Sequence, residues 1–191
     1  MTSVIEAAKE LFSERGPDQV TLREVAEVAK VNHALIHRHF GTKDNLLKVV
    51  LHQEALAFSQ ATVSAVNSPD VARRLFEEQQ HREPFVRILA YALLQGTPTE
   101  FLYSEQGALA GLVSRLQNEP ASEGGSAVPR VDPAIAVAAV SAFTKGWLIF
   151  ESWVLRAVGY SGDIAIVRDE VVGILEHIIR LAESGIERPT T

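Results

Sequence analysis

The sequence predicts an all-α protein of about nine helices. Apolar residues recur at helical spacing from the first turn onward, as in Ile5, Ala8, Leu11 and Phe12. Helix-start signals and Gly or Pro stops divide the chain, and no stretch alternates convincingly with the two-residue period of a half-buried strand. With 191 residues, of which 47% are hydrophobic, the chain is long enough to bury a core of its own.

The first three helices each begin at a polar residue that can cap them, and the cap residues are Ser3 with Glu6, Thr21 with Glu24, and Asn32. In the first two pairs, an S/T-x-x-E capping box lets each side chain bond a free backbone N–H of the other residue. Gly16 followed by Pro17 ends the first helix. We therefore expect two short helices joined by a tight turn after the first one.

The third helix has two unlike faces. Its apolar side chains are Val31, Ile36 and Phe40, and its other side carries Asn32, His33, His37 and Arg38. The exposed face is therefore polar or basic and has no carboxylate, which suits a helix that enters the major groove of DNA. Thr42 then caps a fourth helix, expected to run to about Val66, with Lys43 in its first turn, where backbone amides can hold a phosphate.

Helix-start signals continue through the rest of the chain. The expected helices span 69–80, 83–96, 97–118, 133–159 and 162–185, and 118–132 is expected to be a flexible loop rich in Gly, Pro and Ser.

Charge and composition exclude several kinds of protein. The absence of cysteine removes disulfides and thiolate chemistry, and the net charge of −6 argues against a general polyanion binder. No acidic residue lies between Glu27 and Asp44, so this window forms a local positive face. We see no signal segment and no apolar run near the ~18 residues of a membrane span, and we expect a cytoplasmic protein with no membrane partner and no cofactor.

Three runs of fixed spacing fall within about the first 50 residues. Ile5 to Gly16 fits apolar-x-A-A-x-x-L-F-x-x-x-G, Thr21 to Val31 fits T-x-x-x-[IV]-A-x-x-A-x-V, and Ile36 to Leu46 fits [LI]-[YH]-x-[HY]-F-x-x-K-x-x-L. Together they resemble the tetracycline-repressor (TetR) type of bacterial transcriptional regulators. The chain departs from this family at Lys30, where Gly is usual in the turn, and at His37, where a phosphate-binding Tyr is most common. A side chain at Lys30 implies a turn that tolerates it, with positive φ at some strain.

The resemblance implies a helix-turn-helix DNA-binding domain over 1–47 and a helical effector-binding and dimerisation domain over 48–191. At helix starts, Thr21, Thr42 and Lys43 are expected to hold phosphates, joined by His37, Arg38 and His39. The residues expected at base edges are Asn32, His33, Ala34 and Leu35. For Leu35 and His39, packing inside the small domain is an equal alternative.

The last two helices are expected to pair with their copies in a homodimer, because the final helix has two apolar faces. The expected interface residues are Gly146, Trp153, Val171, Leu175 and Ile178; the alternative is a core buried within one subunit. The expected effector is a mainly apolar small molecule, contacted by Phe85, Tyr91, Gln95, Phe143, Thr144, Trp147 and Phe150. Plain core is the alternative for each of these aromatics.

His33 and His37 have a spacing that can hold a metal, with His39 nearby. Because DNA contact explains the same residues and no carboxylate shares the helix, the sequence gives no reason to assign a metal site. No residues form a recognisable catalytic arrangement, so we do not expect an enzyme. The function predicted is a ligand-responsive DNA-binding regulator, most simply a repressor on a palindromic operator. The alternative is a helical ligand-binding or protein-interaction module that has lost specific DNA binding.

Overall fold

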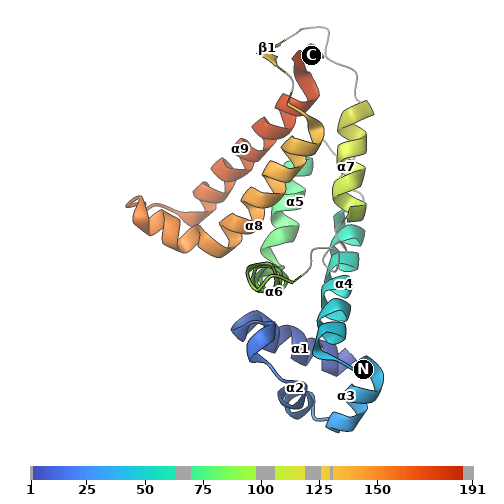
Figure 1. Ribbon diagram of the computed structural model, residues 1–191. Coiled ribbons are helices and arrows are strands. Elements are labelled where there is room, and N and C mark those ends of the chain that lie inside the picture. The colour runs from blue at the N-terminus through green and yellow to red at the C-terminus, as the bar shows by residue number, and fades with distance from the viewer. Residues whose placement is uncertain (1, 63–69, 98–105, 119–125, 130, 187–191) are drawn as a thin grey trace. The chain divides into compact units, whose positions relative to one another are not determined.

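The computed structural model describes residues 2–62, 70–97, 106–118, 126–129 and 131–186. In chain order these residues form α1 (Thr2–Arg15), the 3-10 helix η1 (Pro17–Gln19), α2 (Leu22–Val28), α3 (His33–Phe40), α4 (Lys43–Thr62), α5 (Val71–Gln80), α6 (Glu83–Leu94), α7 (Gln106–Asn118), β1 (Ser126–Pro129), α8 (Pro133–Ala157), α9 (Ile164–Ser184) and β2 (Gly185–Ile186). The predicted all-α class is confirmed (Figure 1).

Local helix signals are confirmed at several starts. Thr21 and Glu24 form the expected capping box, and the side chains of Asn32 and Asp132 accept backbone hydrogen bonds at the starts of α3 and α8. α1 begins at Thr2, one residue before the predicted cap at Ser3. The start signals predicted at 68–69 and 98–100, and the expected end of α4 at residue 66, lie outside the described residues.

The chain divides into two compact units. The first comprises Met1–Ser59 and Arg82–Glu105, and the second comprises Gln60–His81 and Gln106–Thr191. The first unit therefore contains α6 together with α1 to α3 and most of α4, so its core is built from segments distant in the sequence.

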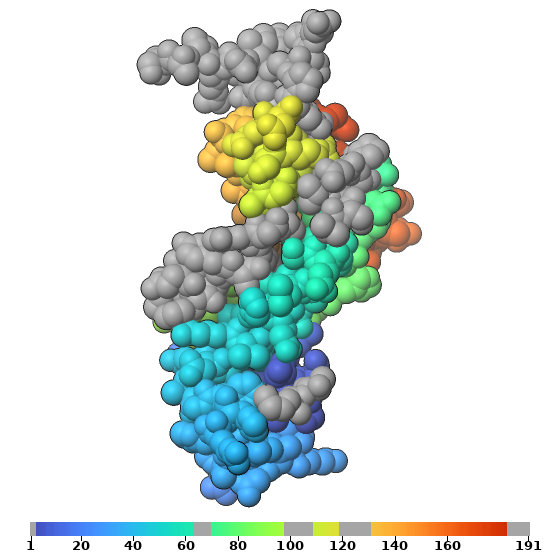
Figure 2. Space-filling model, turned by 90° about the vertical axis from the view of Figure 1, so that its right-hand side faces the viewer, coloured from blue at the N-terminus to red at the C-terminus, as the bar shows by residue number. Residues whose placement is uncertain are grey.

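In the first unit, α1 packs against α6 and α2, and α2 packs against α3. The side chains that form its centre are at most 1% exposed, and they include Ala8, Phe12, Val25, Ile36 and Leu46. The light-blue atoms of α3 and of the start of α4 lie at the surface of this unit (Figure 2). The buried residues of α2 and α3 thus fix a helix-turn-helix with an outward face.

In the second unit, α8 and α9 run antiparallel and side by side, α5 packs against both, and α7 packs against α8 (Figure 1). The apolar stripe of α9 supplies much of this core, because Val171, Val172, Leu175 and Ile179 are all at most 4% exposed. α5 and α7 thus pack around the α8–α9 pair.

Two short strands lie in this unit. β1 pairs in parallel with β2, with Ser126 opposite Gly185 and Pro129 opposite Ile186. The expectation of a flexible loop over 118–132 is therefore wrong for residues 126–129. The pairing partner lies near the end of the chain, so a local pattern does not indicate it.

By length and composition, α8 is the one described helix that could cross a membrane. The expectation that no apolar run approaches that length is wrong, because an 18-residue window of this 25-residue helix is apolar enough to cross a membrane, although Lys145 lies near the middle of the helix. Only 22% of its most apolar window is buried by the rest of the chain, so much of this apolar surface has no partner within the described residues. Interface and core helices of globular proteins meet the same criterion.

Candidate nucleic-acid interface

The start of α2 is fixed by a capping box around Glu24. The Thr21 backbone N–H and hydroxyl both donate to Glu24 Oε2 at 2.8 Å, and the Glu24 N–H donates to Thr21 Oγ1 at 3.2 Å. Arg15 adds a bond to Glu24 Oε1 at 2.8 Å. These hydrogen bonds, led by that from the Thr21 backbone, lower the pKa of Glu24 from 4.5 to about 2. Thr21 is exposed at the predicted phosphate contact, but its hydroxyl must turn from Glu24 to donate to DNA.

The turn between α2 and α3 places Lys30 in the left-handed region, with φ of 55°. The Val31 N–H donates to the Ala26 carbonyl at 3.0 Å, and the Lys30 N–H donates to the Glu27 carbonyl at 3.2 Å. This pair of bonds is a Schellman motif, in which the residue at the Lys30 position is usually Gly. The positive φ predicted for Lys30 is confirmed, and it sets the direction in which α3 leaves the turn.

α3 presents its polar face outward. Ile36 and Phe40 are 1% and 8% exposed and hold the helix on the core, while Asn32 Oδ1 accepts the Ala34 N–H at 2.9 Å. The predicted DNA-contacting side chains of this helix and its cap are all exposed, namely Asn32, His33, Ala34, Leu35, His37, Arg38 and His39. Leu35 is 43% exposed, so packing within the unit does not account for Leu35 or His39.

The start of α4 adjoins the end of α3. Thr42 Oγ1 accepts the Asn45 N–H at 3.2 Å, and the Asn45 side-chain amide donates to the Phe40 carbonyl at 3.0 Å. Thr42 is exposed and Lys43 is half-buried. Thr42 and Lys43 thus lie directly after Gly41, the C-cap of α3.

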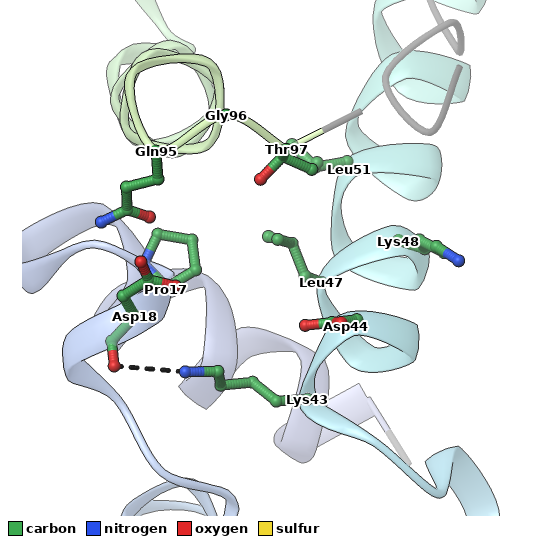
Figure 3. Close-up of a pocket in the computed structure, with 10 residues that line it drawn as sticks. All are labelled: Pro17, Asp18, Lys43, Asp44, Leu47, Lys48, Leu51, Gln95, Gly96 and Thr97. Atoms are coloured by element: carbon green, nitrogen blue, oxygen red, sulfur yellow. Dashed lines mark hydrogen bonds between the residues drawn. The ribbon is translucent and has the colours of Figure 1, made fainter. Parts of the chain in front are cut away.

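Lys43 is held in place by a backbone carbonyl. Its Nζ donates to the Asp18 carbonyl oxygen at 3.2 Å, as drawn in Figure 3. An ammonium group has three donors, so this bond orients Lys43 and leaves donors for a phosphate. Lys43 also borders a cavity of about 330 Å³ lined by Pro17, Asp18, Lys43, Asp44, Leu47, Lys48, Leu51, Gln95, Gly96 and Thr97. Its volume lies at the small end of the range of ligand pockets.

Three residues predicted to contact an effector belong to the first unit. Phe85 is 2% exposed, with the Arg82 guanidinium 5.6 Å from its ring centroid. Tyr91 covers Gly16, because a Cβ added to Gly16 would lie 3.1 Å from the tyrosine ring. Gln95 borders the cavity beside Lys43. For Phe85 and Tyr91 these contacts favour packing within the unit.

The other four predicted effector residues belong to the second unit. Phe143 and Trp147 stack with ring centroids 5.6 Å apart and planes at 10°, and the indole N–H donates to Glu151 at 2.9 Å. Thr144 is buried and donates to the Ser141 carbonyl at 3.1 Å, whereas Phe150 is 55% exposed. The structure thus brings Phe143 and Trp147 together as one half-buried aromatic surface.

The predicted interface residues separate into two groups. Val171 and Leu175 are buried within the chain itself, at 4% and 0% exposure, so their side chains belong to its own core. Trp153 is 66% exposed, Gly146 and Ile178 are half-buried, and a Cβ at Gly146 would meet nothing within 4 Å. Besides Phe150, the large exposed apolar residues of α8 and α9 that were not predicted as interface residues are Ile135, Ile149, Ile164, Ile166 and Ile174. Their place on the same apolar helices is the signal that could have identified them.

An ion-pair cluster in the first unit was not predicted from the sequence. Glu54 of α4 pairs with Lys9 of α1 at 2.6 Å and with Arg82, which precedes α6, at 3.4 Å. The Arg82 guanidinium is also 5.4 Å from the Phe58 ring centroid. The cluster joins α1, α4 and the residue that precedes α6, and its members are too far apart in the sequence for spacing to reveal them.

Comparison with known proteins agrees with this geometry. The family described as bacterial regulatory proteins, tetR family, matches residues 4–50. The chain is 33% identical over 179 residues to the HTH-type transcriptional repressor Rv3405c of Mycobacterium tuberculosis H37Rv, covering 91% of this chain and 88% of that protein. It is 44% identical over 48 residues to the HTH-type transcriptional regulator HbdR of Aromatoleum sp. (strain CIB), covering 25% of this chain and 21% of that one.

Solved structures share the fold. The structure of SCO4942 from Streptomyces coelicolor superposes with a TM-score of 0.73 at 22% identity, covering 93% of this chain and 96% of that chain. The TetR family regulator PfmR of Thermus thermophilus superposes with a TM-score of 0.64 at 18% identity, covering 97% and 96%. The family model matches residues 4–50, which include the outward-facing α3, and the M. tuberculosis relative is 33% identical over 91% of this chain. The chain is therefore a helix-turn-helix transcriptional regulator that belongs to the tetR family.

Proposed function

We propose that this regulator is a repressor, located in the cytoplasm, that binds a palindromic operator as a homodimer and is released by a mainly apolar small molecule. Residues 1–47 bind the operator, and residues 48–191 bind the effector and the second subunit. The observation that carries the proposal is the exposed, carboxylate-free face of α3. The M. tuberculosis relative named as a repressor supports the direction of control.

In this proposal the residues divide into those that position DNA and those that read it. Lys43, Thr42 and Thr21 lie at helix starts, where cations and free amides favour phosphate. The exposed side chains from Asn32 to Leu35 occupy the first turn of α3, which faces base edges in a helix-turn-helix. Base contacts then give specificity, and phosphate contacts give orientation and affinity.

Selection from random duplex DNA tests this proposal. We expect an enriched inverted repeat whose half-sites are separated by one helical turn or a few more base pairs. If no sequence is enriched even at low salt, the chain is instead a helical binding module without specific DNA recognition.

The homodimer is supported by the apolar surface of the second unit. Phe150, Trp153, Ile166 and Ile174 are each more than half exposed on α8 and α9, and large exposed apolar residues in such number mark an interaction surface. Pairing of α8 and α9 with their copies would cover them in a four-helix arrangement. Sedimentation equilibrium at micromolar concentration should give twice the mass of the 20.9 kDa chain, and a monomer would refute the pairing.

Release by an effector is proposed as a shift between dimer states with different separations of the two α3 helices. The Phe143–Trp147 stack is the surface on which we place the effector, because its half-buried rings present apolar area while the indole N–H is already satisfied by Glu151. Linkage requires operator DNA to weaken effector binding by the same factor as effector weakens DNA binding. Equal effector affinity with and without operator would contradict this mechanism.

A further inference from the structure

Two histidines form a pair on the outward face of α3. His33 and His37 are one helical turn apart and both exposed, with ring centroids 5.9 Å apart and ring planes at 76°. Neither imidazole has a hydrogen bond or ion pair with another described residue. The pair therefore offers two imidazoles to the same volume of solvent, and His33 is itself among the residues proposed to read bases.

We propose that His33 and His37 chelate a borderline transition-metal ion such as Zn²⁺, and that the bound ion competes with operator DNA. The metal is then a regulatory ligand, not a resident cofactor. Its binding rests on α3 alone, whereas the competition rests on the proposed DNA-binding function.

The geometry is close to that of a chelate. With Zn–N bonds of about 2.0–2.1 Å, each ring centroid lies roughly 3.2 Å from the metal, so two centroids in a tetrahedral site lie about 5 Å apart. The observed 5.9 Å exceeds this by less than about 1 Å. Rotation of two exposed side chains closes such a gap without moving the backbone, and imidazole nitrogen is a ligand that Zn²⁺, Ni²⁺ and Cu²⁺ share.

The chelate has two protein ligands and water in its remaining positions. His39 is two residues from His37, and this helical spacing puts it on another side of α3. Binding should therefore be weaker than at a structural zinc site with four protein ligands. No group of three or more His, Cys, Asp or Glu that could hold a metal occurs among the described residues, so they contain no larger cluster that would compete for the ion.

Metal and operator use the same atoms. A ring nitrogen bound to metal can no longer donate to a base edge or a phosphate, and the hydrated ion occupies the space that a base edge would fill. The charge of the ion still attracts the DNA backbone, so affinity for unrelated DNA should not fall. The ion should therefore weaken binding to operator DNA more than it weakens binding to unrelated DNA.

The first test uses the full-length protein without DNA. Zn²⁺ titrated into the wild type in a calorimeter should bind at one ion per subunit, and binding should be lost in both His33→Ala and His37→Ala. His52→Ala is the matched control, because His52 is exposed on α4 outside this pair, and it should bind like the wild type. Thermal melting checks the fold of each variant. Unchanged Zn²⁺ binding in His33→Ala or His37→Ala overturns the site.

The second test compares operator affinity with and without Zn²⁺ for each protein. Saturating Zn²⁺ should weaken operator binding by the wild type about tenfold, within the usual range of coupling between ligands. It should leave the operator affinity of His33→Ala and His37→Ala unchanged. Tighter or equal binding of the wild type in Zn²⁺ overturns the competition. If no operator exists, only the proposed function fails, because the calorimetric test does not involve DNA.

Discussion

Replacing Lys30 by Gly should stabilise the protein. At φ of 55°, an L-residue in the left-handed region costs about 1–2 kcal/mol relative to the right-handed one. Glycine avoids this cost, although its greater freedom in the unfolded chain returns about 0.5–1 kcal/mol. The Lys30 side chain is exposed, and the two Schellman bonds use only backbone atoms, so no contact is lost. We expect a net gain of about 0.5–1 kcal/mol in the free energy of unfolding.

Thermal unfolding measures this gain. For a chain of this size, the expected change is a rise in Tm of about 1–4 °C. Lys30→Ala removes the same charge but keeps the strain, and it should not raise Tm. Gln53→Gly, at an exposed position inside α4, should lower the free energy of unfolding by about 1 kcal/mol. If Lys30→Gly unfolds at the same or a lower temperature than the wild type, the strained turn is not the dominant effect at this position.

Three further predictions follow from the same geometry. Lys43→Ala should weaken binding to all duplexes alike and reduce the slope of log K against log salt by about 0.9 per subunit, measured by fluorescence anisotropy; a changed sequence preference would contradict its positioning role. The pKa of Glu24 lies below its unfolded value of 4.5, so its stabilising contribution is present above pH 4.5 and is lost as pH falls towards about 2. Over that interval the Tm of the wild type should fall more than that of Glu24→Gln, and parallel curves would contradict the capping box. Trp153→Glu should shift the sedimenting species from dimer to monomer, whereas Gln53→Glu should not; an unchanged dimer would place the interface elsewhere.

The DNA-facing part of the fold could be read from the sequence because its signals are local. The capping bonds of Thr21 with Glu24 and of Asn32 connect residues only two or three positions apart. The positive φ of Lys30 was instead suggested by the resemblance to the TetR type, in which Gly is usual at this position of the turn. The capping bonds depend on neighbouring residues alone, so spacing and residue type are sufficient to predict them.

Features that join distant segments could not be read in this way. Glu54 meets Lys9 and Arg82, and Lys43 meets the Asp18 carbonyl, only because the first unit brings these segments together. On α9, the periodicity of the sequence predicted an apolar stripe, but it did not predict which residues of that stripe are buried by other helices. Leu175 is buried while the neighbouring Ile174 is 52% exposed. The missing information in each case is which helix packs against which.

The claim that the carboxylate-free face of α3 reads DNA is tested most directly by adding a carboxylate to it. Ala34→Glu changes an exposed residue of this face, and Gln53→Glu adds the same charge at an exposed position on α4. On the palindrome obtained by selection, Ala34→Glu should lose about tenfold to hundredfold in affinity, the equivalent of about 1–3 kcal/mol for one base contact. Gln53→Glu should stay within about twofold of the wild type, since an exposed charge away from the interface has little effect. Wild-type affinity in Ala34→Glu would show that α3 is not the reading helix.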